Sequence, residues 1–100
     1  MSFVKVQIDV IRWAENKGIT KATAEVQALK LMSELGELSD CIIKQDKKGI
    51  YEELGDVIVT LVILSEILKI DFTECFYKSY EKIKNRTGRR LDNGVFIKDE

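Results

Sequence analysis

Four carboxylates stand in two short stretches whose sequences resemble each other. In each stretch a Leu and a Gly separate two acids, which are Glu34 and Glu37 in the first and Glu53 and Asp56 in the second. If both stretches are helical, each pair lies at positions i and i+3 on one helix face. Like charges at this spacing repel mildly, so a solvated acidic surface and a cation site are the two interpretations.

The flanking residues favour the cation site. The first pair of acids continues a polar stripe through Gln27 and Lys30 on a helix whose other faces are largely apolar. In the second pair, Asp56 adjoins residues 57–64, the most hydrophobic stretch of the chain. Acids in such surroundings are expected to be partly buried, and four converging carboxylates would then repel strongly unless a cation neutralised them.

Carboxylate oxygens as the only ligands select a hard cation. The sequence therefore predicts a Mg²⁺ site, with Mn²⁺ as the alternative, at Glu34, Glu37, Glu53 and Asp56. The prediction requires two consecutive antiparallel helices, the first of which ends by about Lys44. An end at Asp46 would offset the pairs by about 9 Å, using the helical rise of about 1.5 Å per residue.

Composition narrows the classes of protein. The 100 residues predict one globular domain, residues 1–100, with 45% hydrophobic and 33% charged residues. A net charge of −1 argues against general attraction to nucleic acid or an anionic membrane. The lack of His excludes His-dependent nucleophilic catalysis and His-ligated metals, and Cys41 and Cys75 form no CxxC motif. The longest uncharged apolar stretch is too short for a membrane span, so a cytoplasmic location is expected.

The pattern of apolar residues predicts an all-α bundle of four helices with a short C-terminal tail. Residues 3–17 also alternate as a strand would, but their length and Gly18 favour a helix. The other helices are expected over residues 20–44 with Thr20 as N-cap, over residues 50–69, and from Asp71 to Gly88. Residues 95–97 are expected to pack as a tail or to pair as an edge strand.

Two observations bear on contacts between helices. Gly36 and Gly55 each stand inside a predicted helix, at a cost of about 1 kcal/mol relative to Ala, which predicts close approach of a helix backbone or a ligand. Residues 57–64 are apolar nearly all round, which predicts burial on several sides and a homodimer interface.

A basic segment follows the acids. Residues 78–90 contain six Lys or Arg and one Glu, and Lys82, Asn85, Arg86 and Arg89 share one side if this segment is helical. Such cations either complement the C-terminal helix dipole or contact phosphates, and the nearby acids favour phosphate. Trp13 at helical spacing is either a core residue or a platform on which a base stacks.

Together these residues resemble the MazG-like all-α nucleoside triphosphate pyrophosphohydrolases, whose pattern is Glu-x-x-Glu followed by Glu-x-x-Asp. The resemblance spans about residues 10–90, and Ser33 departs from it because many relatives have Glu there. The further matching segments are Trp13-Ala14, Gly18-Ile19, Gln27-Ala28-Leu29-Lys30-Leu31, Glu53-Leu54-Gly55-Asp56-Val57 and Tyr80-Glu81-Lys82-Ile83-Lys84-Asn85-Arg86.

The resemblance implies Mg²⁺-dependent hydrolysis of a nucleoside triphosphate, expected to be a deoxynucleotide, to monophosphate and pyrophosphate in nucleotide-pool house-cleaning. It places the metal ligands at Glu34, Glu37, Glu53 and Asp56, and Glu37 or Glu53 would be the general base. Substrate contacts are expected from Lys30, Lys82, Asn85, Arg86 and Trp13. A homodimer, or a tetramer of two dimers, is expected. The alternative is a non-catalytic helical module for dimerisation or partner binding.

Overall fold

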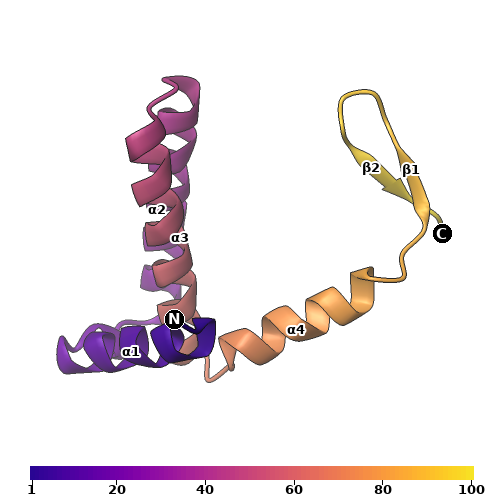
Figure 1. Ribbon diagram of the computed structural model, residues 1–100. Helices are drawn as coiled ribbons and strands as arrows, with labels where there is room; N and C mark the ends of the chain where they lie inside the picture. Colours follow the sequence, from indigo (N-terminus) through magenta and orange to yellow (C-terminus); the bar gives the residue numbers. More distant parts are fainter.

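The computed structural model describes all residues from 1 to 100, and helices account for most of them. Figure 1 shows a long helical hairpin, a helix across its foot, and an arm that leads away. The elements in chain order are α1 (Phe3–Asn16), the 3₁₀ turn η1 (Ile19–Lys21), α2 (Ala24–Ile43), α3 (Lys47–Ile67), α4 (Phe72–Ile83), β1 (Gly88–Arg90) and β2 (Phe96–Lys98).

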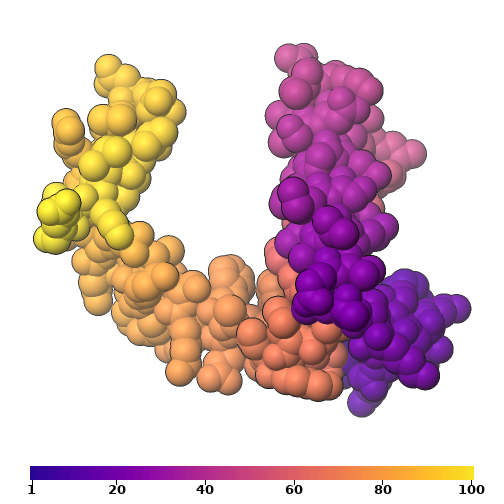
Figure 2. Space-filling view, turned by 180° about the vertical axis from the view of Figure 1, so that it is seen from behind, coloured from indigo at the N-terminus to yellow at the C-terminus, as the bar shows by residue number.

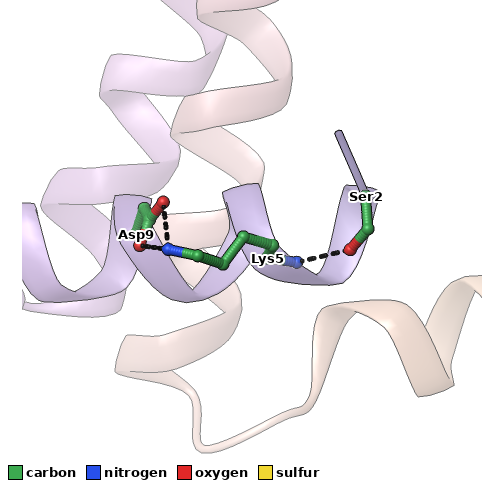
Figure 3. Close-up of polar contacts among 3 residues, drawn as sticks. All are labelled: Ser2, Lys5 and Asp9. Atoms are coloured by element: carbon green, nitrogen blue, oxygen red, sulfur yellow. Dashed lines mark hydrogen bonds and ion pairs between the residues drawn. The ribbon is translucent and has the colours of Figure 1, made fainter.

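The first segment is a helix, as its length and Gly18 predicted. The hydroxyl of Ser2 accepts a hydrogen bond from the Lys5 backbone N–H at 3.0 Å, and the Lys5 ammonium pairs with Asp9 at 2.8 Å (Figure 3). An N-cap and an i,i+4 ion pair both favour a helix over a strand. Gly18 then adopts a φ of 76°, a left-handed conformation that allows the chain to turn into η1.

The turn between α2 and α3 decides how the two acidic stretches face each other. Helix α2 ends at Ile43 with Lys44 as its C-cap, so the condition for a carboxylate site is met. Gln45 takes a φ of 57°, and Asp46 then caps α3 by accepting a hydrogen bond from the Gly49 N–H at 3.0 Å. The two helices run antiparallel and make the most extensive helix packing in the chain.

Three predicted boundaries are wrong. Thr20 lies in η1, and the cap of α2 is Thr23, whose hydroxyl accepts from the Val26 N–H at 3.2 Å. Helix α3 begins at Lys47 and not at residue 50, because the Asp46 cap comes earlier than the apolar pattern suggested. Helix α4 does not reach Gly88, which pairs with Lys98 in the hairpin of β1 and β2.

The apolar core lies where α1 crosses the foot of the α2–α3 hairpin. Its buried apolar residues are Ala14 of α1 and Val57, Val62 and Ile63 of α3. This agrees with the expected burial of residues 57–64 in part, since Ile58 stays 39% exposed. Gly36 and Gly55 have open space around them within the chain, so no helix backbone approaches them closely, and the alternative of a ligand at these glycines stays a prediction.

The all-α class, the four helices and the C-terminal tail are confirmed, and the tail forms the edge-strand pairing that was one of the two alternatives. The four helices do not close into a bundle within one chain, however. Helix α4 meets the rest of the chain at its start, where Phe72 stacks on Phe3 at 5.9 Å and Thr73 bonds to Gln7. Figures 1 and 2 show it and the hairpin leading away as an arm.

None of the helices combines the length and the apolar character that crossing a membrane requires, although α2 and α3 have 20 and 21 residues.

The Asp46 cap gives a first prediction. Asp46→Ala removes the acceptor for the Gly49 N–H and should lower the free energy of unfolding by about 1 kcal/mol. Asp46→Asn keeps an acceptor oxygen and should cost much less. Thermal or urea unfolding measures both variants, and equal losses would show that the charge of Asp46 matters more than its cap.

Candidate functional site

Three of the four predicted acids meet between α2 and α3. One carboxylate oxygen each from Glu34, Glu37 and Glu53 lies within 4.8 Å of the others. Glu34 is buried, Glu53 is half-buried and Glu37 is exposed, so the cluster opens toward solvent on one side. Asp56 is outside this group of three, but its charge acts on Glu53 and it lines the same groove as Glu34.

The cluster is electrostatically incomplete. One oxygen of Glu34 and one of Glu53, the Oε2 atom in each case, are sealed from solvent and have no hydrogen-bond partner. A buried acceptor without a partner costs about 1–3 kcal/mol, and more when it is charged. Burial first, then a hydrogen bond to Glu37 and repulsion from the neighbouring acids, raise the pKa of Glu53 from 4.5 to about 7.

Lys30 partly neutralises the cluster. Its ammonium lies 3.0 Å from Oε1 of Glu34, one helical turn along α2. The hydrogen bond to Glu34 and the attraction of this and the neighbouring acids raise the pKa of Lys30. The Lys30 side chain is 60% exposed, so its charge also faces solvent beside the acids. One ammonium leaves the site with a net negative charge.

A groove with a volume of about 880 Å³ begins at the acids and extends toward α1. The groove is charged at one end, where Lys30, Glu34 and Asp56 line it. Its other end is mainly apolar, and the residues there include Trp13, Ile19, Ala22, Val26 and Ile63. Trp13 is half exposed, so its interpretation as a core residue is wrong, and its ring lines the groove instead.

Sequence reasoning missed several residues of this groove. Ile19 and Ala22 line it because η1 brings them there, and no local pattern signalled that turn. Gln27 was noted only as part of a polar stripe, although it is 5% exposed and lines the groove together with Thr60. The position of Gln27 in the polar stripe, two helical turns before the predicted ligand Glu34, was the sequence signal that could have identified it.

The predicted cations of the C-terminal segment do not join the acids within one chain. Helix α4 ends at Ile83, so Asn85 and Arg86 lie in the turn beyond it, and their placement with Lys82 on one helical side is wrong. Helix α4 starts near the C-terminal end of α3. This end lies about 20 Å along α3 from Glu53, using the rise of about 1.5 Å per residue. Figure 1 shows α4 leading away from that end, and none of its residues lines the groove.

Comparison with known proteins decides the family. The sequence profile of the MazG nucleotide pyrophosphohydrolase domain matches residues 22–91. The chain belongs to the MazG family. The expected resemblance to all-α nucleoside triphosphate pyrophosphohydrolases is thereby confirmed, and the matched range includes all four acids, Lys82 and Arg86 but not Trp13.

Two comparisons with individual proteins accompany the family match. An uncharacterised 18.2 kDa protein of Haemophilus phage HP1, from its rep-hol intergenic region, is 34% identical over 64 residues, which are 63% of this chain and 39% of that protein. The structure of the cyanophage S-2L MazG-like pyrophosphohydrolase, bound to dGDP and three catalytic Mn²⁺ ions per active site, superposes with a TM-score of 0.73 at 22% identity. The alignment covers 100% of this chain and 95% of that chain, so the two share a fold.

The raised pKa of Glu53 predicts a pH dependence of stability in the absence of divalent cations. A carboxyl that binds its proton more tightly when folded stabilises the folded state most below its unfolded pKa of 4.5, and this contribution is lost as pH rises toward about 7. In a chelating buffer, the unfolding temperature of the wild type should therefore fall over this pH range more steeply than that of Glu53→Gln.

The exposed neighbour Glu52 provides the control, because Glu52→Gln should leave the pH profile unchanged. Thermal unfolding at several pH values measures all three proteins. Parallel profiles for wild type and Glu53→Gln would contradict the assignment of the raised pKa.

Proposed function

We propose that this MazG chain hydrolyses a nucleoside triphosphate to a monophosphate and pyrophosphate, with a divalent cation held by Glu34, Glu37, Glu53 and Asp56. The observation that carries the proposal is the pair of sealed carboxylate oxygens without partners, on Glu34 and Glu53, at the charged end of a groove of about 880 Å³. Membership in a family of nucleotide pyrophosphohydrolase domains supports the reaction.

The acids fit a hard divalent cation. Sealed oxygens on α2 and α3 lack any donor, and a cation satisfies such oxygens without needing a proton on either. Glu34 and Glu53 would hold the cation from the buried side, Glu37 from the exposed side, and Asp56 from the groove. We propose Mg²⁺ as the working cation with Mn²⁺ as a substitute, and the Mn²⁺ in the cyanophage relative supports a divalent ion.

When bound there, the cation would neutralise phosphate charge and make an attacking water more acidic. Glu37 and Glu53, whose carboxylate oxygens lie within 4.8 Å of each other at this end of the groove, would be the groups that accept a proton from the attacking water. Lys30 places a positive charge beside Glu34, where it also attracts a phosphate oxygen.

The deoxynucleotide preference rests on the cyanophage relative, which was captured with dGDP. The mainly apolar end of the groove, which Lys21 also lines, has Trp13 half exposed in its wall, and this supports stacking of a base there. A role in nucleotide-pool house-cleaning and a cytoplasmic location stay predictions. This chain spans about two fifths of the length of the phage HP1 relative, whose whole activity is therefore not carried over.

We further propose that the chain is a homodimer in which α4 of one copy lies along the α2–α3 hairpin of the other. The arm has little support in its own chain, since Phe76, Tyr77 and Tyr80 are each more than half exposed and the two-stranded hairpin beyond it stands alone. Isolated hairpins of this size are marginally stable in water. We therefore expect both α4 and the two-stranded hairpin to pack against another protein surface.

Charge supports a second copy of the chain as that surface. Residues 78–90 carry six Lys or Arg and one Glu, whereas residues 24–67 carry nine Asp or Glu and four Lys. An arm from the partner would bring the partner's Lys82 and the partner's Arg86 to acids that their own chain does not reach. Pairing of such dimers into tetramers stays a prediction.

The site assignment predicts the loss of activity on neutralising single acids. Glu53→Gln and Asp56→Asn should each lower cation-dependent pyrophosphate release by at least about 100-fold. Mutating a residue that only hydrogen-bonds to a metal ligand already lowers metal affinity or activity by about 10–100-fold, and a ligand itself should matter more. Both helices should persist in circular dichroism. The exposed acid Glu52, changed to Gln, is the matched control and should keep wild-type activity.

Full activity in both Glu53→Gln and Asp56→Asn would overturn the site. The rival assignment, a non-catalytic partner-binding module, makes a different prediction. It expects no thermal stabilisation of the wild type by Mg²⁺ with a non-hydrolysable triphosphate, whereas the enzyme should be stabilised by both together.

The dimer predicts complementation between two inactive variants. Glu53→Gln and Arg86→Ala carry their lesions in different parts of the site, so a mixed dimer regains one intact site of two and should show about half of wild-type activity. Mixed dimers are obtained by co-expression with two affinity tags. A mixture of Glu53→Gln with Asp56→Asn is the control and should stay inactive, since both lesions fall in the acidic cluster. An inactive first mixture would contradict the supply of Arg86 by the partner.

A further inference from the structure

Gln27 is a buried amide in the wall of the groove. Only 5% of its surface is exposed, although its neighbours along the groove, Val26 and Lys30, are well exposed. Its Nε2 group donates a hydrogen bond to the backbone carbonyl of Thr60 on α3 at 3.2 Å. The Thr60 hydroxyl is occupied within α3, where it donates to the Asp56 carbonyl at 2.8 Å. The amide of Gln27 is therefore held by a backbone carbonyl within α3.

This contact determines which way the amide faces. Because the NH₂ group is turned to the Thr60 carbonyl, the carbonyl oxygen Oε1 is the acceptor left over. Oε1 accepts no hydrogen bond from the protein, and it is not among the oxygens sealed from solvent. A buried side chain in the groove wall thus keeps one acceptor that no donor of the protein occupies. Acceptors of this kind discriminate between ligands, since a ligand without a donor leaves them unpaired.

The position of Gln27 along the groove fits a nucleobase. It stands seven residues before Glu34, which is two helical turns or about 10 Å along α2. Lys30 lies between them and contacts Glu34. A nucleotide whose phosphates occupy the acidic end would extend its sugar past Lys30 and place its base between Gln27 and Trp13, both of which line the groove.

We propose that Gln27 is a specificity-determining residue, whose Oε1 accepts a hydrogen bond from an N–H group on the edge of the nucleobase while Trp13 covers the base face. The inference rests on the proposed function and adds to it the part of the substrate that the chain recognises. Every standard base offers such an N–H, so this contact rejects bases whose donor is missing or blocked and does not by itself distinguish one standard base from another.

The experiment compares two substrates in each protein. The nucleotide that the wild type hydrolyses fastest is paired with its analogue in which that N–H is methylated, at N1 of guanine, at N3 of thymine or uracil, or twice on the amino group of adenine or cytosine. The ratio of kcat/KM between parent and analogue should be about tenfold or more in wild type, the scale of a lost hydrogen bond. In Gln27→Met, which keeps the side-chain volume, the ratio should fall close to one.

A purely structural role would lower kcat/KM for both substrates equally and leave the ratio unchanged. Gln7→Met is the matched control, because Gln7 is also buried, bonds to Thr73 and lies outside the groove. It should affect stability but not the ratio. An unchanged ratio in Gln27→Met with normal pyrophosphate release overturns the role of Gln27 alone. If wild type releases no pyrophosphate from any nucleotide, the proposed function and this inference both fall.

Discussion

Repulsion among carboxylates held between two packed helices is the constraint on which the rest of this site depends. Glu34, Glu37 and Glu53 are brought together by apolar packing of α2 on α3, and this packing does not itself neutralise them. Lys30 offsets one charge, a raised pKa of Glu53 offsets another, and two sealed oxygens are left without any partner. A divalent cation resolves all of these at once, which is why the geometry fits one.

The groove is charged at one end and mainly apolar at the other, as a nucleotide is charged at its phosphates and less polar at its base. Acids and Lys30 occupy the end to which the proposed function assigns phosphates and a cation, whereas the far end is mainly apolar, with Trp13 and Lys21 in its wall. Gln27 stands between these ends with one acceptor that no donor of the protein occupies. Helix α1 and η1 contribute only to the apolar end, and they do so by crossing the foot of the hairpin (Figure 1). The acidic cluster thus belongs to α2 and α3 alone, whereas the other end of the groove also needs α1 and η1.

The arm formed by α4 and the hairpin of β1 and β2 is poorly packed, because it leaves large apolar side chains in water. Phe76, Tyr77 and Tyr80 are each more than half exposed, although Phe76 lies beside Phe72. A stable isolated helix of 12 residues is not expected in water. Both facts agree with an arm that is completed by a second copy, whose acidic hairpin complements the basic residues 78–90.

The sequence by itself determined the features that depend on neighbours along the chain. The i,i+3 spacing placed each pair of acids on one helix face, and Asp71 marked the start of α4, because caps and helix faces are local. Only the tertiary structure decided that Asp56 lies outside the group of three acids, that Trp13 lines a groove, and that Arg86 stands far from the acids. Distances between helices depend on where a turn such as 44–46 ends one helix and how far the next one tilts, and those quantities are set by packing, which no local spacing encodes.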